Sequence, residues 1–288
     1  MKIIVMGASG LLGTTLVPIL KEKNYKVITH SLKSASDYNV DISKIDASKK
    51  FLESIRPQII VNLIGLTNVD LCEEDNDLAF NLNARTVENI ASYVANNDCH
   101  LIHISTDQLY DGQGMQKEED ILLKNYYASS KYSGELAARK CSSTILRTNF
   151  FGKSICKNRQ SLTDWIILSL SNNKKINGFK DVIFNPLRME TIAKIILQII
   201  DLKLQGTYNL GSRCPMSKAD FIYKFAELNN LDTQNIERVS VENMSFIKTY
   251  RPKNMQMDCS KLESELKIKL PTLENELIKE AKRYVTSR

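Results

Sequence analysis

Three of the 11 glycines in this 288-residue chain stand at positions 7, 10 and 13, directly after an apolar run at residues 2–6. One glycine permits a tight strand-to-helix turn, one lets a pyrophosphate approach the backbone, and one allows close packing of helix on strand. A phosphate would lie against the unpaired N–H groups at the start of the helix. The pattern therefore predicts a dinucleotide-binding βαβ unit, with a tight turn that binds no ligand as the alternative. The cofactor contacts predicted from this turn are Gly7, Ser9, Gly10 and Gly13.

Apolar runs of strand length alternate with segments of helical periodicity over the first 150 residues. Strands that are apolar on both faces are typical of a parallel sheet covered by helices. The sequence therefore predicts an α/β fold with a doubly wound parallel sheet of the Rossmann type. The expected strands are 2–6, 26–29, 59–64, 101–104 and 144–146, and the expected helices are 11–23, 47–55, 78–96 and 129–140.

After residue 150 this alternation breaks down into loop-like sequence and shorter elements. We expect residues 1–150 to form the NAD(P)-binding domain, with a helix and strand near 189–211 rejoining it. Residues 151–188 and 212–288 are expected to form a smaller C-terminal substrate-binding lobe over the carboxyl edge of the sheet. The expected elements of this half are helices at 161–171, 189–204, 218–228 and 273–286 and an extended piece at 236–241.

Composition excludes several other classes of protein. The net charge of +6 comes from scattered lysines, which predicts a solvated surface and no nucleic-acid partner. The six cysteines show no close pairing, so we expect neither zinc nor disulfides, and a cytoplasmic location. No apolar stretch reaches the ~18 residues of a membrane span, so no membrane partner is expected. The sequence leaves the oligomeric state open, with a homodimer as one alternative.

The end of the second expected strand bears on the choice of dinucleotide. An acidic residue there would bind the ribose 2′-hydroxyl of NADH, but the chain has Ser31 followed by Lys33. A hydroxyl and a cation suit a 2′-phosphate better, so NADPH is the expected cofactor and NADH the alternative. Lys33 could also be an ordinary solvated lysine.

Tyr127 and Lys131 stand four residues apart in an expected helix, which places them on one face, one turn apart. An adjacent ammonium is expected to lower the pKa of the phenol, so that Tyr127 can pass a proton near neutral pH. Thr106 ends an expected strand, where open α/β sheets bind ligands, and could hydrogen-bond the same carbonyl oxygen. Such a Tyr–Lys pair also occurs by chance as a buried ring beside a surface ammonium.

With these residues the sequence resembles the extended short-chain dehydrogenase/reductases, and among them the dTDP-4-dehydrorhamnose reductase group. The resemblance covers nearly the whole chain, and the Arg251 motif near the carboxyl terminus is its most specific part. The motifs are the glycine turn, Asp41-Ile42, Thr67-Asn68-Val69-Asp70, Asn81-Leu82-Asn83-Ala84, Ser105-Thr106-Asp107, Tyr127 to Lys131, Leu146-Arg147-Thr148, and Arg251-Pro252-Lys253-Asn254 with Met257-Asp258.

The resemblance implies roles for individual residues. Thr106, Tyr127 and Lys131 are the implied catalytic set. Phe150 stands where the family has a tryptophan beside the sugar, and Leu123 stands where it has a proline. The family's acidic metal site near the carboxyl terminus cannot be placed, so no metal is expected. Further implied cofactor contacts are Leu11, Leu12, Asp41, Ile42, Gly65, Thr67, Ser105, Tyr127 and Lys131, and the implied substrate contacts are Thr106, Asp107, Asn149, Phe150 and Arg251.

These residues lead us to expect an NADPH-dependent reductase of a nucleotide-linked 4-keto-6-deoxy sugar. Arg147 and Arg251 are candidates for contacts near the sugar nucleotide, because guanidinium groups suit paired phosphate oxygens. Alternatively, either arginine could join the two lobes by pairing with a carboxylate. One alternative function is a nucleotide-sugar epimerase. Another is a non-catalytic NADP-binding regulatory subunit, similar to the beta subunit of methionine adenosyltransferase.

Overall fold

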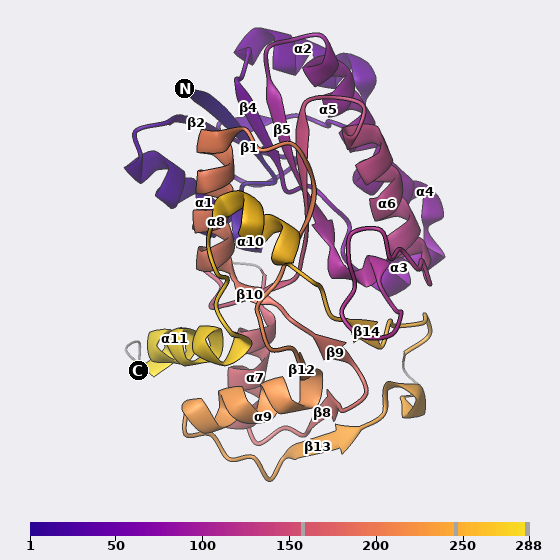
Figure 1. The fold of residues 1–288 in the computed structure, drawn as a ribbon, viewed down its shortest axis with the longest axis vertical. Helices are drawn as coiled ribbons and strands as arrows, with labels where there is room; N and C mark the ends of the chain where they lie inside the picture. The colour runs from indigo at the N-terminus through magenta and orange to yellow at the C-terminus, as the bar shows by residue number, and fades with distance from the viewer. Residues whose placement is uncertain (157–158, 245–246, 286–288) are drawn as a thin grey trace.

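The computed structural model describes residues 1–156, 159–244 and 247–285, and its centre is a seven-stranded parallel sheet (Figure 1). The strand order β3-β2-β1-β4-β5-β6-β11 reverses direction between β1 and β4, as in a doubly wound Rossmann sheet. The predicted fold class is therefore confirmed. The strands are β1 (Lys2–Met6), β2 (Lys26–Ser31), β3 (Tyr38–Asn39), β4 (Ile59–Asn62), β5 (His100–Thr106), β6 (Ser143–Thr148) and β11 (Gly206–Leu210).

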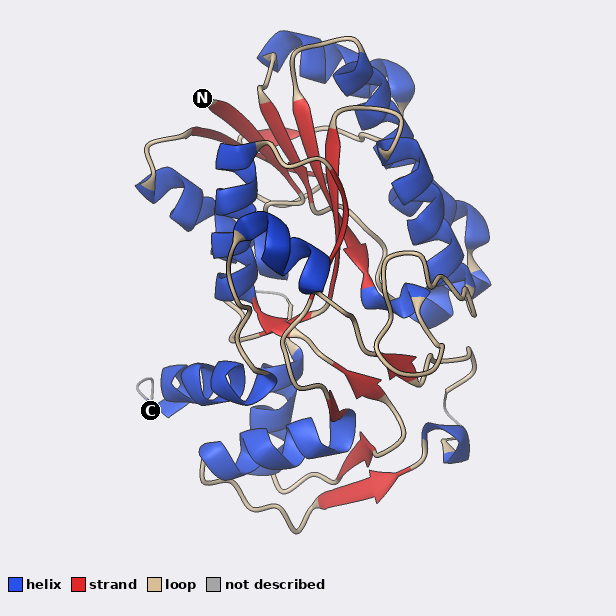
Figure 2. Ribbon diagram, in the orientation of Figure 1, coloured by secondary structure: helices blue, strands red, loops and turns tan. Residues whose placement is uncertain are grey.

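Helices cover both faces of this sheet (Figures 1 and 2). One face packs against α1 (Leu11–Glu22) and α8 (Met189–Leu202), and the other against α2 (Ile45–Ile55), α5 (Thr86–Ala95) and α6 (Tyr126–Ala138). All residues of β4, β5 and β6 are buried, which explains why their central residues are apolar without alternation. The short helix α10 (Ser260–Leu266) lies against β11.

A smaller second lobe lies beyond the carboxyl ends of the strands (Figure 2). Its core is built around Phe151, Phe184, Phe221 and Phe225, whose rings pack against one another. Parallel pairing joins β7 (Phe150–Phe151) to β10 (Leu187–Arg188) and β8 (Ile176–Phe179) to β13 (Ile236–Val239). The other elements are α7 (Leu162–Ser171), β9 (Ile183–Phe184), β12 (Met216–Ser217), α9 (Lys218–Leu228), β14 (Asn254–Met255) and α11 (Leu273–Val285).

Some elements differ from the sequence-based expectation. The expected helix 78–96 is divided into α4 (Asn76–Phe80), a π-helical turn Asn81–Arg85 and α5, and α3 (Val69–Glu74) precedes it. Helix α6 begins at Tyr126 instead of residue 129, because the Asn125 side chain accepts a hydrogen bond from the backbone N–H of Ala128 at 2.8 Å. Residue 286, the expected end of the last helix, lies outside the described residues. Among the described helices, none has the length and apolar character that crossing a bilayer requires.

Candidate functional site

The glycine turn joins β1 to α1 at the point where the strand order reverses, which is where open α/β sheets bind ligands. Gly7 has φ +76°, a backbone conformation that side chains disfavour, and a Cβ on Gly13 would lie 2.6 Å from the carbonyl oxygens of Gly7 and Ala8. Gly10 is the N-cap residue of α1 and supplies no side-chain hydrogen bond. The backbone N–H groups of the first helical turn therefore stay available to an anion.

Two adjoining hollows run along this turn. The Ser31 hollow is lined by the glycine turn, the end of β2 and the segment that contains Asp41 and Ile42. The Tyr127 hollow is lined by the glycine turn, the ends of β5 and β6, and α6. The two hollows adjoin, because both are lined by Gly7, Gly10 and Gly65, and we call them together the cofactor cleft.

The structure brings nearly all of the sequence-predicted site residues into this cleft. Lys33, Arg147 and Arg251 are the three that line neither hollow. Arg159 lines both hollows, although no motif in the sequence drew attention to it. The predicted residues in the Ser31 hollow are Gly7, Ser9, Gly10, Ser31, Asp41, Ile42 and Gly65. Those in the Tyr127 hollow are Gly7, Gly10, Leu11, Leu12, Gly13, Gly65, Thr67, Ser105, Thr106, Asp107, Tyr127, Lys131, Asn149 and Phe150.

Tyr127 and Lys131 lie in the first turns of α6, and both side chains are buried. The Lys131 ammonium donates to the carbonyl oxygen of Ile104 at 2.7 Å. Burial lowers the pKa of Lys131 to about 8, and the charge of Glu135 acts in the opposite direction. The ammonium is thus held in the Tyr127 hollow. Its pKa is close enough to neutral pH for the group to gain or lose a proton.

The expected lowering of the Tyr127 pKa is wrong. Burial raises the pKa of this phenol well above its ordinary value, and the neighbouring Thr106 hydroxyl acts against that rise. The cost of burying a phenolate therefore exceeds the favourable interactions around it. Tyr127 is consequently neutral near pH 7, which is the form that can donate a proton.

A buried asparagine on the π-helical turn connects the strand side of the cleft to α6. The Asn83 side chain accepts from the backbone N–H of Leu66 at 2.8 Å and donates to the Ser130 hydroxyl at 2.9 Å. It thereby fixes the segment after β4 against the helix that carries Tyr127 and Lys131. The motif at residues 81–84 is part of the resemblance to the reductases. Nothing in the motif itself predicted that Asn83 positions α6. Such π-helical turns are frequent at functional sites.

Asp107 lies at the far side of the Tyr127 hollow and accepts a hydrogen bond from the Asn149 side chain at 2.7 Å. Burial raises the pKa of Asp107 to about 6. Burial also lowers the pKa of Lys218, while the charge of Asp107 acts in the opposite direction. Lys218 begins α9 of the second lobe, so a cation from a distant part of the sequence interacts with Asp107, and nothing in the local sequence singled it out.

Arg147 corrects another expectation. Its side chain is fully buried and donates to Glu135 at 2.6 and 2.9 Å and to the Tyr110 hydroxyl at 2.7 Å. The Ser105 hydroxyl donates to the same carboxylate at 2.6 Å. The guanidinium therefore neutralises a buried glutamate behind the cleft and is not exposed to a sugar nucleotide.

Arg251 ties two distant segments together. Its guanidinium donates to the Asp70 carboxylate at 2.7 Å and to the carbonyl oxygen of Thr249 at 3.0 Å. Asp70 belongs to α3, beside the central sheet, whereas Arg251 precedes β14 of the second lobe. This contact corresponds to the alternative in which the arginine joins the two halves of the protein.

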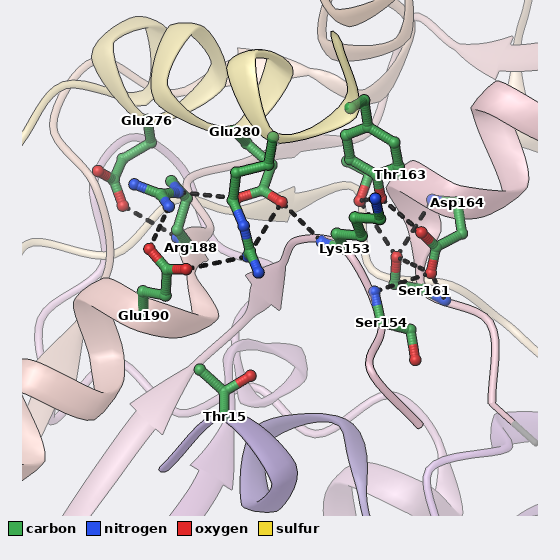
Figure 3. A network of polar contacts seen from close by, with 12 residues as sticks. Thr15, Lys153, Ser154, Ser161, Thr163, Asp164, Arg188, Glu190, Glu276 and Glu280 are labelled. Carbon is green, nitrogen blue, oxygen red and sulfur yellow. Dashed lines mark hydrogen bonds and ion pairs between the residues drawn. The ribbon is translucent and has the colours of Figure 1, made fainter. Parts of the chain in front are cut away.

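An acidic cluster lies where α11 meets the start of α8 (Figure 3). Arg188 donates to Glu280 at 2.8 Å, and its backbone N–H donates to Glu276 at 3.0 Å. Glu190 pairs with Arg188 and with Arg283. Guanidinium groups already neutralise Glu190 and Glu280, so the cluster does not fit a metal ion. Within the parts of the chain that the structure describes, no group of three or more His, Cys, Asp or Glu side chains is arranged to hold one.

Comparisons of sequence and fold show which known proteins this chain is similar to. A probable low-salt glycan biosynthesis reductase, Agl14 of Haloferax volcanii, is 28% identical over 95% of each chain. Methionine adenosyltransferase 2 subunit beta of Xenopus laevis is 26% identical over 90% of this chain and 81% of its own. A Bacillus anthracis dTDP-4-dehydrorhamnose reductase, solved in complex with NADP, superposes with a TM-score of 0.88 at 25% identity over 100% of this chain and 99% of its own. The RmlD substrate binding domain family matches residues 1–286, so the chain belongs to that family.

Proposed function

We propose that this protein is an NADPH-dependent reductase of a nucleotide-linked 4-keto-6-deoxy sugar. The observation that carries the proposal is the placement of Thr106, Tyr127 and Lys131 in one hollow that is continuous with the glycine turn. The proposal is supported by the NADP complex of the Bacillus anthracis reductase and by the similarity to a glycan biosynthesis reductase. The six free cysteines fit the cytoplasm as its location.

NADPH supplies a hydride to C4 of the sugar when it is bound in the cofactor cleft. Tyr127 donates its phenolic proton to the carbonyl oxygen, so that the ketone becomes an alcohol. The Thr106 hydroxyl donates a hydrogen bond to the same oxygen and orients it. The Lys131 ammonium binds the ribose and favours loss of the Tyr127 proton by its charge. The Asp107 carboxylate would accept a hydrogen bond from a sugar hydroxyl group. The Asn149 amide would donate one to a sugar hydroxyl group.

We propose that residues 1–150 and the segment near 189–211 form the cofactor-binding domain. Residues 151–188 and 212–288 form the substrate-binding lobe. The second lobe has a hollow lined by Trp165, Phe179 and Lys218, among other residues. Lys218 lines this hollow, and the charge of Asp107, which lines the Tyr127 hollow, acts on it. We place the nucleoside part of the substrate there, where aromatic rings can stack on a base.

Oxidation of NADPH in the presence of a panel of nucleotide 4-keto sugars tests this function directly. We expect consumption of NADPH with at least one of them, and one alcohol formed per NADPH consumed. An epimerase would return its cofactor unchanged and consume none. Stable capture of a protein partner, with no turnover of any sugar, would favour the regulatory subunit instead; the intact Thr106, Tyr127 and Lys131 favour the enzyme.

Binding of the two dinucleotides is expected to favour NADPH. Ser31 is buried at the end of β2, and its hydroxyl donates to the carbonyl oxygen of Ser34 at 2.7 Å, so no carboxylate stands at this position. Ser31→Asp should shift the preference toward NADH by at least about tenfold, because a carboxylate repels the 2′-phosphate and accepts a hydrogen bond from the 2′-hydroxyl. Fluorescence titrations with both dinucleotides measure the ratio.

Lys33→Met is a useful companion variant. The Lys33 side chain is exposed, so it can be changed without disturbing the loop around Ser31. The variant should weaken NADPH binding and leave NADH binding unchanged. Equal affinity of the wild-type protein for both dinucleotides would contradict the proposed preference.

The pH dependence of reduction is expected to follow Lys131. Its ammonium is the active form, and its pKa is lowered to about 8, so kcat/KM should fall as the pH rises through about 8. Glu135 and His103 are the other titratable groups that interact with this ammonium. Burial keeps the Tyr127 phenol protonated over the same range. Steady-state kinetics between pH 6 and 10 measure the profile, and a constant kcat/KM up to pH 10 would contradict the role of Lys131.

A further inference from the structure

Arg159 lies where the two hollows of the cofactor cleft meet. It lines the Ser31 hollow together with Asp41 and Ile42, and it lines the Tyr127 hollow together with Lys131. If the adenosine part of a dinucleotide occupies the first hollow and the nicotinamide part occupies the second, the diphosphate bridge must cross between them. Arg159 is therefore beside the middle of the bound cofactor.

The segment that leads to Arg159 is anchored in the second lobe. After β7, the backbone N–H of Lys153 donates to Glu280 at 2.7 Å, and the backbone N–H of Ser154 donates to Asp164 at 3.0 Å (Figure 3). The Ser154 hydroxyl in turn donates to the carbonyl oxygen of Arg159 at 2.6 Å. These contacts hold the backbone of Arg159 in place from α7 and α11.

The same segment also contacts the glycine turn. The Cys156 thiol donates to the carbonyl oxygen of Ser9 at 3.2 Å, and its sulfur lies 3.3 Å from the Thr14 hydroxyl. Residues that are far apart in the sequence are thus brought to one edge of the cleft. Arg159, three residues after Cys156, lines the cleft beside the same glycine turn.

The charge of Arg159 is available to a ligand. Its side chain is exposed, and no carboxylate of the described residues forms an ion pair with it. Lys131, the other cation that lines the cleft, is buried and already donates to Ile104. The N–H groups at the start of α1 carry only partial charge, whereas a diphosphate bridge carries two full negative charges. Guanidinium groups bind paired phosphate oxygens with two parallel hydrogen bonds.

We propose that Arg159 binds the diphosphate bridge of the dinucleotide and, with the glycine turn, holds the two halves of the cofactor in register. The inference rests on the proposed function, since it requires a dinucleotide in the cofactor cleft. Two other phosphate groups share this chemistry: the 2′-phosphate of NADPH and the diphosphate of the nucleotide sugar. Binding to the diphosphate bridge predicts that NADPH and NADH are affected alike, because both dinucleotides contain it.

The test compares Arg159→Met with the wild-type protein by fluorescence titration of NADPH and NADH. Both affinities should fall by a factor of roughly 10 to 100, with their ratio unchanged, since one charge-assisted contact is lost. Arg159→Lys keeps the charge but not the planar guanidinium group. Its affinities for both dinucleotides should lie between those of the wild-type protein and those of Arg159→Met. Arg56→Met is the matched control, because Arg56 is exposed at the end of α2 and lines neither hollow. It should bind both dinucleotides normally.

Other outcomes overturn the inference in distinguishable ways. Loss of NADPH affinity alone would place Arg159 at the 2′-phosphate. A higher KM for the nucleotide sugar, with both dinucleotide affinities unchanged, would place it at the substrate. Unchanged affinities and kinetics would show that the side chain is solvent-exposed without a binding role, while the proposed function would stand. A wild-type protein that binds neither dinucleotide would overturn both.

Discussion

Tyr127→Phe is expected to reduce turnover of the 4-keto sugar by a factor on the order of 10² to 10⁴, because it deletes the hydroxyl group that we propose as the proton donor. The substitution keeps the aromatic ring, which packs against Val69, Cys72 and Ala79. Folding and NADPH binding should therefore survive. Steady-state kinetics, together with circular dichroism and an NADPH titration on the same preparation, separate the loss of chemistry from a loss of structure.

Two neighbouring variants serve as comparisons. Thr106→Val removes one hydrogen bond and keeps the shape of the side chain, so it should cost less turnover than Tyr127→Phe. Lys131→Met should weaken NADPH binding as well as turnover, because the same ammonium serves the ribose and the phenol. A Tyr127→Phe enzyme with near-normal turnover would show that the proton comes from another group and would remove the proposed mechanism.

Arg147→Met is expected to lower the free energy of unfolding by about 3–5 kcal/mol, because it leaves the carboxylate of Glu135 buried without its fully buried partner. The Ser105 hydroxyl and the partly exposed Arg139 guanidinium, 3.4 Å from Glu135, would remain, but the closer, two-pronged contact with Arg147 would be gone. Chemical denaturation followed by circular dichroism measures the loss. The expected cause is structural, so any residual folded enzyme should keep its KM for the nucleotide sugar.

Arg251→Met is the matched control for that experiment. The Arg251–Asp70 pair is partly exposed, so its removal should cost less than about 1 kcal/mol. The double variant Arg147→Met with Glu135→Gln should recover part of the stability, because it removes the unpaired charge as well. Equal losses from Arg147→Met and Arg251→Met would contradict the account of a buried ion pair.

The fold was predictable because it follows from local patterns. Apolar runs such as residues 2–6 and the glycine spacing at 7, 10 and 13 indicate strand, turn and helix from neighbouring residues alone. The break of the long helix before Thr86 was not predicted, since it arises where the π-helical turn packs against α6. A periodic pattern carries no signal for one extra residue in a helical turn.

The candidate site, like the fold, could be predicted from the sequence only in part. The residues of the glycine turn and the pair Tyr127 and Lys131 could be named from spacing and resemblance, because their chemistry depends on separations of three or four residues. The pKa of Tyr127 could not be predicted, since burial by distant segments decides whether the phenolate is tolerated. A sequence shows which groups are adjacent along the chain, but not how much water each retains.

The sequence by itself determined the doubly wound sheet, the glycine turn and the side chains that we propose to react. The tertiary structure decided what three arginines do: Arg147 neutralises a buried carboxylate, Arg251 joins the two lobes, and Arg159 lies beside the cleft without an ion-pair partner among the described residues. These three arginines are indistinguishable as residue types, and their partners lie far away in the sequence. Which carboxylate or phosphate a guanidinium meets is set by the path of the folded chain, because electrostatic partners are chosen by distance and burial in space.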